Sequence, residues 1–241
     1  MNQHDHFLAM DTATRTPTLA LGHPDGQLVG ERHWVSEHRH GEQLIERLDD
    51  LLADAGVDRR DLKAVVVGLG PGSFTGLRIG LATAKTLAYS LNVPIVGIST
   101  SEALALAAAD GGARRNDVAV SLPAGAVDRY VQRISVDGDP VSVTALGEAQ
   151  LAVPGDSFAA AVGDALLVAV DMAAADDISD ESIERGQRAV AGLAQALVTI
   201  GNKVLVEGRS DDVARLVPAY VALPRGIAKA VAEMTWSPDL R

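Results

Sequence analysis

An apolar run, 64-AVVVGLG-70, leads through a turn rich in glycine into a helical pattern that continues to about Leu91. A continuous apolar strand is typical of a sheet covered on both faces. A strand followed directly by a helix is the repeating unit of α/β folds. The next segments, 93-VPIVGIS-99 and 100-TSEALALAAAD-110, repeat this order of strand and helix. The sequence therefore predicts an α/β fold.

Three further strands are predicted before this region, at 7–13, 18–23 and 27–34. The last two are separated by 24-PDG-26, in which proline fixes φ and glycine accepts a positive φ, as a hairpin requires. Residues 41–56 place leucines at helical spacing, with charged residues on the opposite face. Gly56 is positioned to end this helix. The predicted order for residues 1–110 is therefore βββαβαβα.

The second half repeats this beginning with three predicted strands, at 117–122, 129–136 and 141–146. A helix at 182–201 and a strand at 203–208 complete a looser copy, and a last helix is predicted at 223–236. The segment 111-GGARR-115 has the composition of a linker. We therefore expect two lobes, 1–110 and 111–241, with mixed sheets in a ribonuclease-H-like or actin-like arrangement.

Composition limits the possible functions of the 241-residue chain. There is no cysteine, which excludes disulfides, thiolate metal sites and a cysteine nucleophile. The net charge of −11 is spread over both halves and argues against tight unaided binding to nucleic acid, because phosphate neutralisation dominates that affinity. The N-terminus shows no signal-peptide pattern, and no apolar stretch approaches a membrane span. We expect a cytoplasmic protein that does not contact membranes.

The glycine-rich loop in 68-GLGPGSFTGLRIG-80 resembles a phosphate-binding loop at first sight. A Walker loop requires lysine and a hydroxyl residue directly after its last glycine, whereas Gly76 is followed by Leu77 and Arg78. The dinucleotide pattern G-x-G-x-x-G is not matched either. The loop is interpreted as a tight turn between strand and helix, with Ser73 as the helix N-cap. Anion binding at the helix N-terminus is the alternative.

Small side chains recur every fourth residue along the helix that follows this loop: Gly76, Gly80, Ala84 and Ala88. Glycine inside a helix costs roughly 1 kcal/mol relative to alanine, so the pair needs a physical reason. We predict that this stripe allows close approach of another protein, while Ile79, Thr83 and Leu87 face the chain's own sheet. The alternative is that both faces pack within the chain.

Two other groups are weaker candidates for ligand sites. Asp11 ends the first predicted strand in 11-DTAT-14, without the glycine that would let a turn wrap around a nucleotide phosphate. We interpret it as a solvated aspartate, with a nucleotide site as the alternative. His38 and His40 lie before a helix, but they lack the H-E-x-x-H spacing of a zinc helix. No metal site and no catalytic residue is predicted.

The segment 68-GLGPGSFTGLRIGLATAKTLAYSLNVPIVGISTSEALA-105 closely resembles the TsaB (YeaZ) family of tRNA threonylcarbamoyladenosine biosynthesis proteins. Shorter pieces, 8-LAMDTAT-14, 38-HRHGEQL-44 and 218-PAYV-221, match in the same order. The resemblance implies two lobes of the actin and sugar-kinase superfamily, with a smaller or degenerate second lobe. It also implies a non-catalytic subunit that docks and activates TsaD, the subunit that transfers the threonylcarbamoyl group to adenosine beside the anticodon of ANN-decoding tRNAs.

The resemblance further implies that no cofactor is bound firmly by this chain, with ATP and metal held by partner subunits. The implied partners are a TsaD-like subunit and a TsaE-like ATPase, with tRNA reached only through the complex. Docking would use helices 41–55 and 74–91, and the same helices could form a homodimer. The predicted partner interface is Leu44, Leu48, Ser73, Thr75, Gly76, Leu77, Arg78, Gly80, Leu81 and Ala84.

One region departs from the family pattern. Many members carry D-A-R-[RM]-G-E-V-Y on the first hairpin of the second lobe, whereas this chain has 121-SLPAGAVDRYVQ-132. Only Asp128, Arg129 and Tyr130 partly match that pattern. Two enzymatic alternatives remain open: an ATP-dependent small-molecule kinase using Asp11, and a metallopeptidase, which is suggested only by older family naming.

Overall fold

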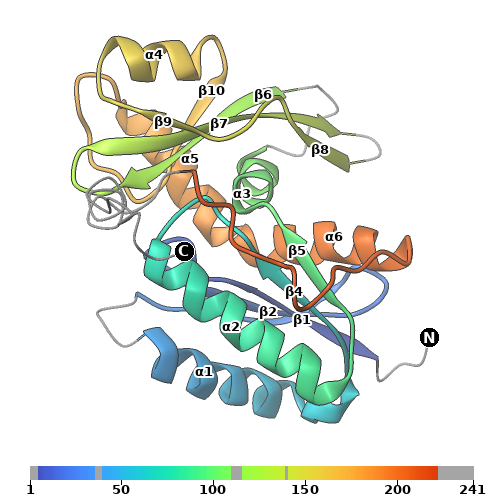
Figure 1. The fold of residues 1–241 in the computed structure, drawn as a ribbon. Coiled ribbons are helices and arrows are strands. Elements are labelled where there is room, and N and C mark those ends of the chain that lie inside the picture. Colours follow the sequence, from blue (N-terminus) through green and yellow to red (C-terminus); the bar gives the residue numbers. More distant parts are fainter. Residues whose placement is uncertain (1–4, 36–39, 110–115, 139–140, 222–241) are drawn as a thin grey trace, which may run out of the picture.

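The computed structural model describes residues 5–35, 40–109, 116–138 and 141–221 (Figure 1). The first half forms a five-stranded sheet in the spatial order β3 (Leu28–His33), β2 (Thr18–Gly22), β1 (His6–Asp11), β4 (Leu62–Gly68) and β5 (Ile95–Ile98). Its helices are α1 (His40–Ala55), α2 (Phe74–Leu91) and α3 (Thr100–Ala108), with a 3-10 turn, η1 (Arg59–Asp61). Strands β1, β2 and β3 are antiparallel, and β1, β4 and β5 are parallel. The predicted order of this half is confirmed.

The second half forms a sheet in the order β10 (Leu166–Ala169), β6 (Asn116–Ala124), β7 (Asp128–Gly138) and β8 (Val141–Ala145), and β9 (Gln150–Ala152) also pairs with β7. Its helices are α4 (Asp156–Val162), α5 (Asp180–Ala191) and α6 (Leu193–Val206). The order β8–β7–β6–β10 repeats β3–β2–β1–β4. Within the described residues no strand corresponding to β5 follows β10. The second lobe is therefore a reduced copy of the first, as predicted.

Two predictions for the second half are wrong. The predicted strand at 203–208 is largely the end of α6, where Val204 and Leu205 pack against the central core. The predicted helix at 182–201 is interrupted at Gly192, where α5 and α6 meet at 58°. Elements β9, α4 and β10 were not predicted. The predicted linker at 111–115 and the predicted helix at 223–236 lie outside the described residues.

No single helix in the described part of the chain is long and apolar enough to cross a membrane, and only the bent pair α5–α6 reaches that length together.

The alternation of β1 divides the interior of the first lobe into two cores. Leu8 and Met10 point to one face, where they pack with leucines of α1 and α2. Phe7 and Ala9 point to the other face, because successive strand residues alternate, and there they join α6. Figure 1 shows α1 and α2 below the first sheet and α6 above it.

Helices α3 and α6 link the two lobes. Helix α6, from the second half, lies on the first sheet, while α3, from the first half, lies against β6, β7 and β8. One apolar cluster therefore includes Val66 of the first sheet, Val120 of the second sheet, and Leu104 and Leu197 of these two helices. The two sheets share a core, so neither lobe has a complete interior of its own.

Candidate functional site

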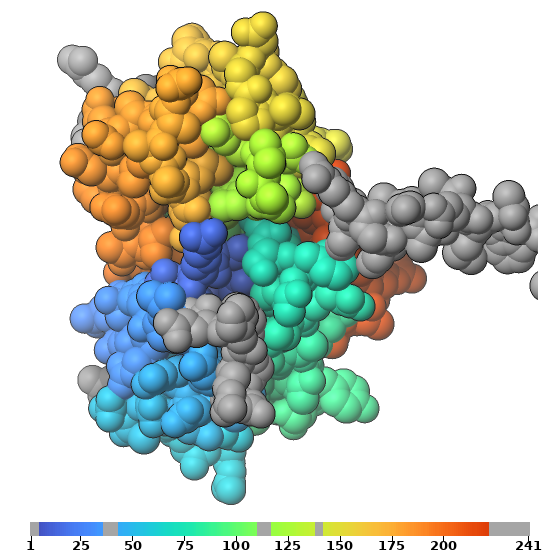
Figure 2. Space-filling view, turned by 90° about the vertical axis from the view of Figure 1, so that its left-hand side faces the viewer, coloured from blue at the N-terminus to red at the C-terminus, as the bar shows by residue number. Residues whose placement is uncertain are grey.

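The carboxyl ends of the parallel strands β1, β4 and β5 meet at the start of α2. Ligands in open α/β sheets bind at such ends, so this region is the first place to look for a site. We call residues 11–14 and 70–76 together the turn junction. Figure 2 shows this face, where the blue N-terminal segment lies beside the teal start of α2 and below the green part of the second lobe.

Asp11 is enclosed in the turn junction. Its Oδ2 accepts a hydrogen bond from the Thr100 hydroxyl at 2.6 Å, and its Oδ1 accepts one from the Ala13 amide at 2.8 Å. The Thr100 hydroxyl in turn accepts from the Gly70 amide at 3.0 Å. These bonds connect the ends of all three parallel strands through one carboxylate.

The environment of Asp11 is closed to solvent. The residue is 0% exposed, and a Cβ atom at Gly68 would overlap its Oδ2. Burial raises the pKa of Asp11 to about 6, against the opposing effect of the hydrogen bonds from Thr100 and Ala13. The interpretation as a solvated aspartate is therefore wrong. The geometry does not favour a contact with nucleotide phosphates either, because the carboxylate presents no surface.

The glycines of α2 lie against the chain's own β1 turn. A Cβ atom at Gly76 would overlap the carbonyl oxygen of Thr12, and one at Gly80 would overlap the Thr12 hydroxyl. That hydroxyl donates to the Gly76 carbonyl oxygen at 2.7 Å. The glycines permit close approach of a backbone, as expected, but the backbone belongs to this chain. The prediction that the stripe faces a partner is wrong.

The loop before α2 is also closed against this turn. The Ser73 amide donates to the Ala13 carbonyl oxygen at 2.7 Å, and Gly72, with φ of 156°, leaves no room for a side chain beside Ala13. The Ser73 hydroxyl accepts from the Gly76 amide at 3.1 Å, so the predicted N-cap is confirmed. This contact within the chain explains why the loop has glycine at position 72 and serine at position 73.

The predicted interface residues separate into two groups. Most lie in the chain's own interior: Leu44, Leu48, Gly76, Leu77, Gly80, Leu81 and Ala84. The others are exposed: Ser73, Thr75 and Arg78. The buried group cannot touch a partner unless the fold opens, because the side chains pack on the sheet and the glycines pack on Thr12. The prediction that these seven residues form a partner interface is therefore wrong.

The exposed side of α2 carries a different stripe, at the spacing of one helical face: Thr75, Arg78, Ala82, Thr86 and Tyr89. We call these five residues the α2 outer face. Tyr89 is 83% exposed, and on the neighbouring helix α1 the apolar Ile45 is 43% exposed. In the described part of the chain Arg78 forms no ion pair with a carboxylate, and its guanidinium lies 5.1 Å from the Phe74 ring centroid.

The C-terminal segment contributes to the same region, which the sequence did not reveal. The Asp211 amide donates to Ile95 of β5, and the Ala219 amide donates to the Leu69 carbonyl oxygen, both at 2.8 Å. Residues 209–221 thus cover the free edge of β5 and return to α2 (Figure 1). There the Tyr220 ring lies 5.1 Å from that of Phe74. The match at 218–221 was the signal that could have indicated this contact.

The remaining candidates do not form a site. His38 and the side chain of His40 lie outside the described residues, which hold no group of three or more His, Asp or Glu suited to a metal ion. On the β6–β7 hairpin, Arg129 pairs with Asp177 at 2.8 Å and lies 4.3 Å from the Phe158 ring centroid. Arg129 is therefore an interior residue of the second lobe.

The chain is similar to known proteins in both sequence and fold. Residues 34–222 match the family model described as TsaD, tRNA N6-adenosine threonylcarbamoyltransferase. The chain is 40% identical over 99 residues to TsaB of Bacillus subtilis, covering 41% of this chain and 43% of the relative. It is 37% identical over 94 residues to TsaB of Escherichia coli, covering 39% and 40%. The matches thus span less than half the length of either relative.

A solved structure, YeaZ from Pseudomonas aeruginosa, is similar over 90% of this chain and 99% of that one, with a TM-score of 0.66 and 23% sequence identity. At this identity the likeness concerns the fold alone.

Proposed function

The chain belongs to the TsaD family and, within it, to the TsaB/YeaZ proteins, and from this premise we propose that it takes part in forming threonylcarbamoyladenosine in tRNA. Its role in this proposal is that of a non-catalytic subunit, which docks a TsaD-type transferase and holds it in an active shape. ATP and metal would be bound by partner subunits, including a TsaE-type ATPase.

The closed turn junction supports a non-catalytic role. If Asp11 acted in phosphoryl transfer, its carboxylate would have to reach the reacting phosphate or the metal bound to it. Here the Asp11 carboxylate is completely buried and bonded to Thr100 and Ala13. This carboxylate instead joins the end of β1 to Thr100, the first residue of α3.

The α2 outer face carries the docking part of the proposal. Ala82, Thr86 and Thr75 are small, so the axis of a second helix could approach to about 8–10 Å. Tyr89 and Arg78 belong to residue types that are enriched in protein interfaces, and both are exposed. We propose this face as the docking surface because the stripe that contains Gly76 and Gly80 is buried within the chain. A second copy of the chain could compete for the same surface.

The charge of the chain supports recognition of tRNA through the complex. A net charge of −11 disfavours direct contact with a phosphate backbone. A TsaD-type partner would then provide the tRNA-binding surface.

The test is binding of the purified chain to its TsaD-type partner by calorimetry. Ala82→Arg places a long charged side chain in the centre of the α2 outer face, and we expect the dissociation constant to rise at least about 30-fold. Ala160→Arg, at an exposed position of α4 in the other lobe, is the matched control and should bind normally. Equal binding by the two variants would exclude docking through this face.

A second assay tests the pathway itself. The chain should restore threonylcarbamoyladenosine in cells depleted of their own TsaB, and Ala82→Arg should fail to restore it. If neither form restores the modified base, although both are folded and expressed, the proposed role is wrong.

A further inference from the structure

A separate cavity of about 260 Å³ lies between the lobes, and it shares no residue with α1 or α2. It is bounded by α3, α6, β8 and the end of β5. Part of its lining is apolar, contributed by Ile98, Leu106, Val143, Ile200 and Val204. Three hydroxyl side chains, Ser99, Ser142 and Thr199, also line it.

One wall of the cavity holds a carboxylate. Glu102 belongs to the first turn of α3, and its Oε1 accepts a hydrogen bond from the Ala145 amide at 3.3 Å. Burial raises the pKa of Glu102, against the opposing effect of that hydrogen bond. A carboxylate that has lost part of its hydration favours a cation nearby.

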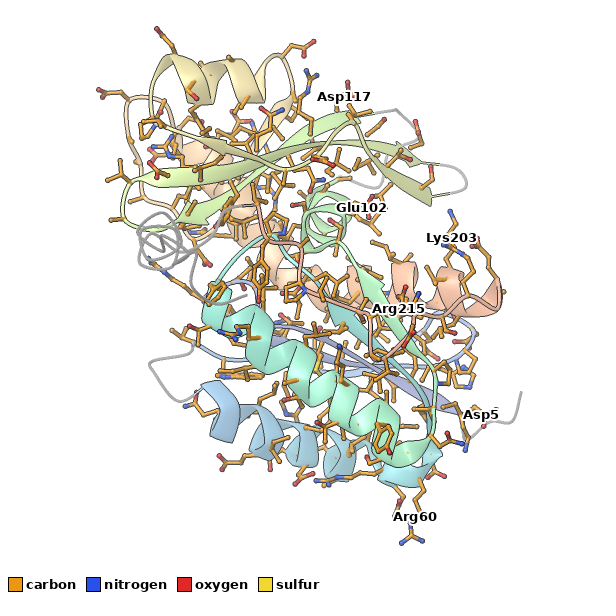
Figure 3. All side chains as sticks on the ribbon, in the orientation of Figure 1. Asp5, Arg60, Glu102, Asp117, Lys203 and Arg215 are labelled. Atoms are coloured by element: carbon orange, nitrogen blue, oxygen red, sulfur yellow. The ribbon has the colours of Figure 1, made fainter. Side chains whose placement is uncertain are left out.

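The opposite wall holds two cations at the end of α6. Lys203 is exposed and makes no ion pair among the described residues, whereas Arg209 pairs with Glu207 at 2.7 Å. Figure 3 shows Glu102 on α3 and Lys203 on α6, in the region between the second sheet and α6. Both residues line the cavity and form no ion pair with each other, so neither charge is neutralised by the other.

We infer that this cavity binds a small zwitterion, namely a free α-amino acid with a short side chain. Its ammonium group would lie toward Glu102 and its carboxylate toward Lys203, which matches one opposite charge on each wall. The side chain would contact Val143 and Ile200, and a hydroxyl on it could bond to the hydroxyl residues of the lining. A ligand with one charge only would leave the other wall unmatched, which costs affinity.

L-threonine is the first probe, and this choice alone rests on the proposed function, since the family description names a threonylcarbamoyl group. Titration of the whole chain should give a dissociation constant of about 1 mM or tighter. Isobutyrate and propylammonium, which each carry one charge, should bind at least about tenfold more weakly.

Two variants test the contacts. Glu102→Gln keeps an acceptor for the Ala145 amide but removes the charge, and Lys203→Gln removes the opposite charge at an exposed position. Each should weaken L-threonine binding at least about tenfold. Lys63→Gln, an exposed lysine on β4 outside the cavity, makes the same charge change and should leave binding unaltered.

The inference is overturned if no heat is detected up to about 10 mM L-threonine, a range in which a weak site of this kind is measurable. It is also overturned if Lys203→Gln and Lys63→Gln bind alike, or if isobutyrate binds as well as threonine. Because no residue of α2 lines the cavity, Ala82→Arg should bind L-threonine normally. Failure of partner docking and failure of this site are therefore separate results.

Discussion

Gly80→Ala is expected to destabilise the protein, although alanine is normally the better helix residue. The new Cβ would overlap the Thr12 hydroxyl, which is buried and bonded to the Gly76 carbonyl oxygen at 2.7 Å. Threonine is stiff at χ1, so the hydroxyl cannot move aside without losing that bond. The contact is therefore relieved only by shifting α2 away from the β1 turn.

The magnitude follows from three contributions. Overpacking a well-filled interior costs about 1–3 kcal/mol, and loss of the hydroxyl hydrogen bond costs about 1 kcal/mol. Replacing glycine by alanine within a helix stabilises the folded state by about 1 kcal/mol. The free energy of unfolding should therefore fall by about 1–3 kcal/mol. If Gly80 faced solvent or a partner, the same substitution would raise the free energy of unfolding of the isolated chain by about 1 kcal/mol.

Urea unfolding of a double-mutant set measures this. In a Thr12→Ala background the overlapping hydroxyl is absent, and the nearest remaining atom of that side chain would lie 3.3 Å from the new Cβ. Gly80→Ala should there become neutral or stabilising. Gly76→Ala is the control, because it meets the Thr12 backbone carbonyl and should stay destabilising in both backgrounds. A stabilising Gly80→Ala in the unaltered chain would refute the reasoning.

Two further predictions concern buried charges. Because the folded pKa of Asp11 is about 6, above its ordinary 3.8, the stability of the unaltered chain relative to Asp11→Asn should be greatest below about pH 4. It should fall by about 3 kcal/mol as the pH rises through 6. Unfolding titrations at several pH values check this, and a difference that grows in the opposite direction would contradict it. Arg129→Met should lower the free energy of unfolding by about 2–3 kcal/mol, through loss of the contacts with Asp177 and Phe158. The side chain of Arg60 is 91% exposed, so Arg60→Met should change the free energy of unfolding by less than about 0.5 kcal/mol. If both substitutions lower the free energy of unfolding equally, the contacts of Arg129 do not stabilise the fold.

Local chemistry was sufficient to predict most of the first lobe. The hairpin at 24–26, the helix end at Gly56 and the N-cap at Ser73 each depend on residues close together in the sequence. All three are confirmed by φ of 87° at Gly26, φ of 65° at Gly56 and the bond from Gly76 to Ser73. The apolar run at 64–70 likewise requires a strand covered on both faces.

The features that could not be predicted depend on contacts between residues that are far apart in the sequence. The spacing of Gly76 and Gly80 showed that one face of α2 has no side chains at these positions. It could not show that Thr12 packs against this face. In the same way, residues 203–206 have strand-like composition, yet the core formed by both sheets keeps them helical. Tyr220 reaches Phe74 only because residues 209–221 follow the edge of β5.

The placement of α6 on the first sheet has a consequence during synthesis of the chain. The inner face of that sheet, with Phe7, Ala9 and Val66, is covered by a helix that begins at Leu193. At about 5–20 residues per second, a ribosome needs about 5–20 s to proceed from Ile98, the end of β5, to Leu193. During that interval the finished sheet presents its apolar face to the surrounding cell, where it is a natural substrate for chaperones.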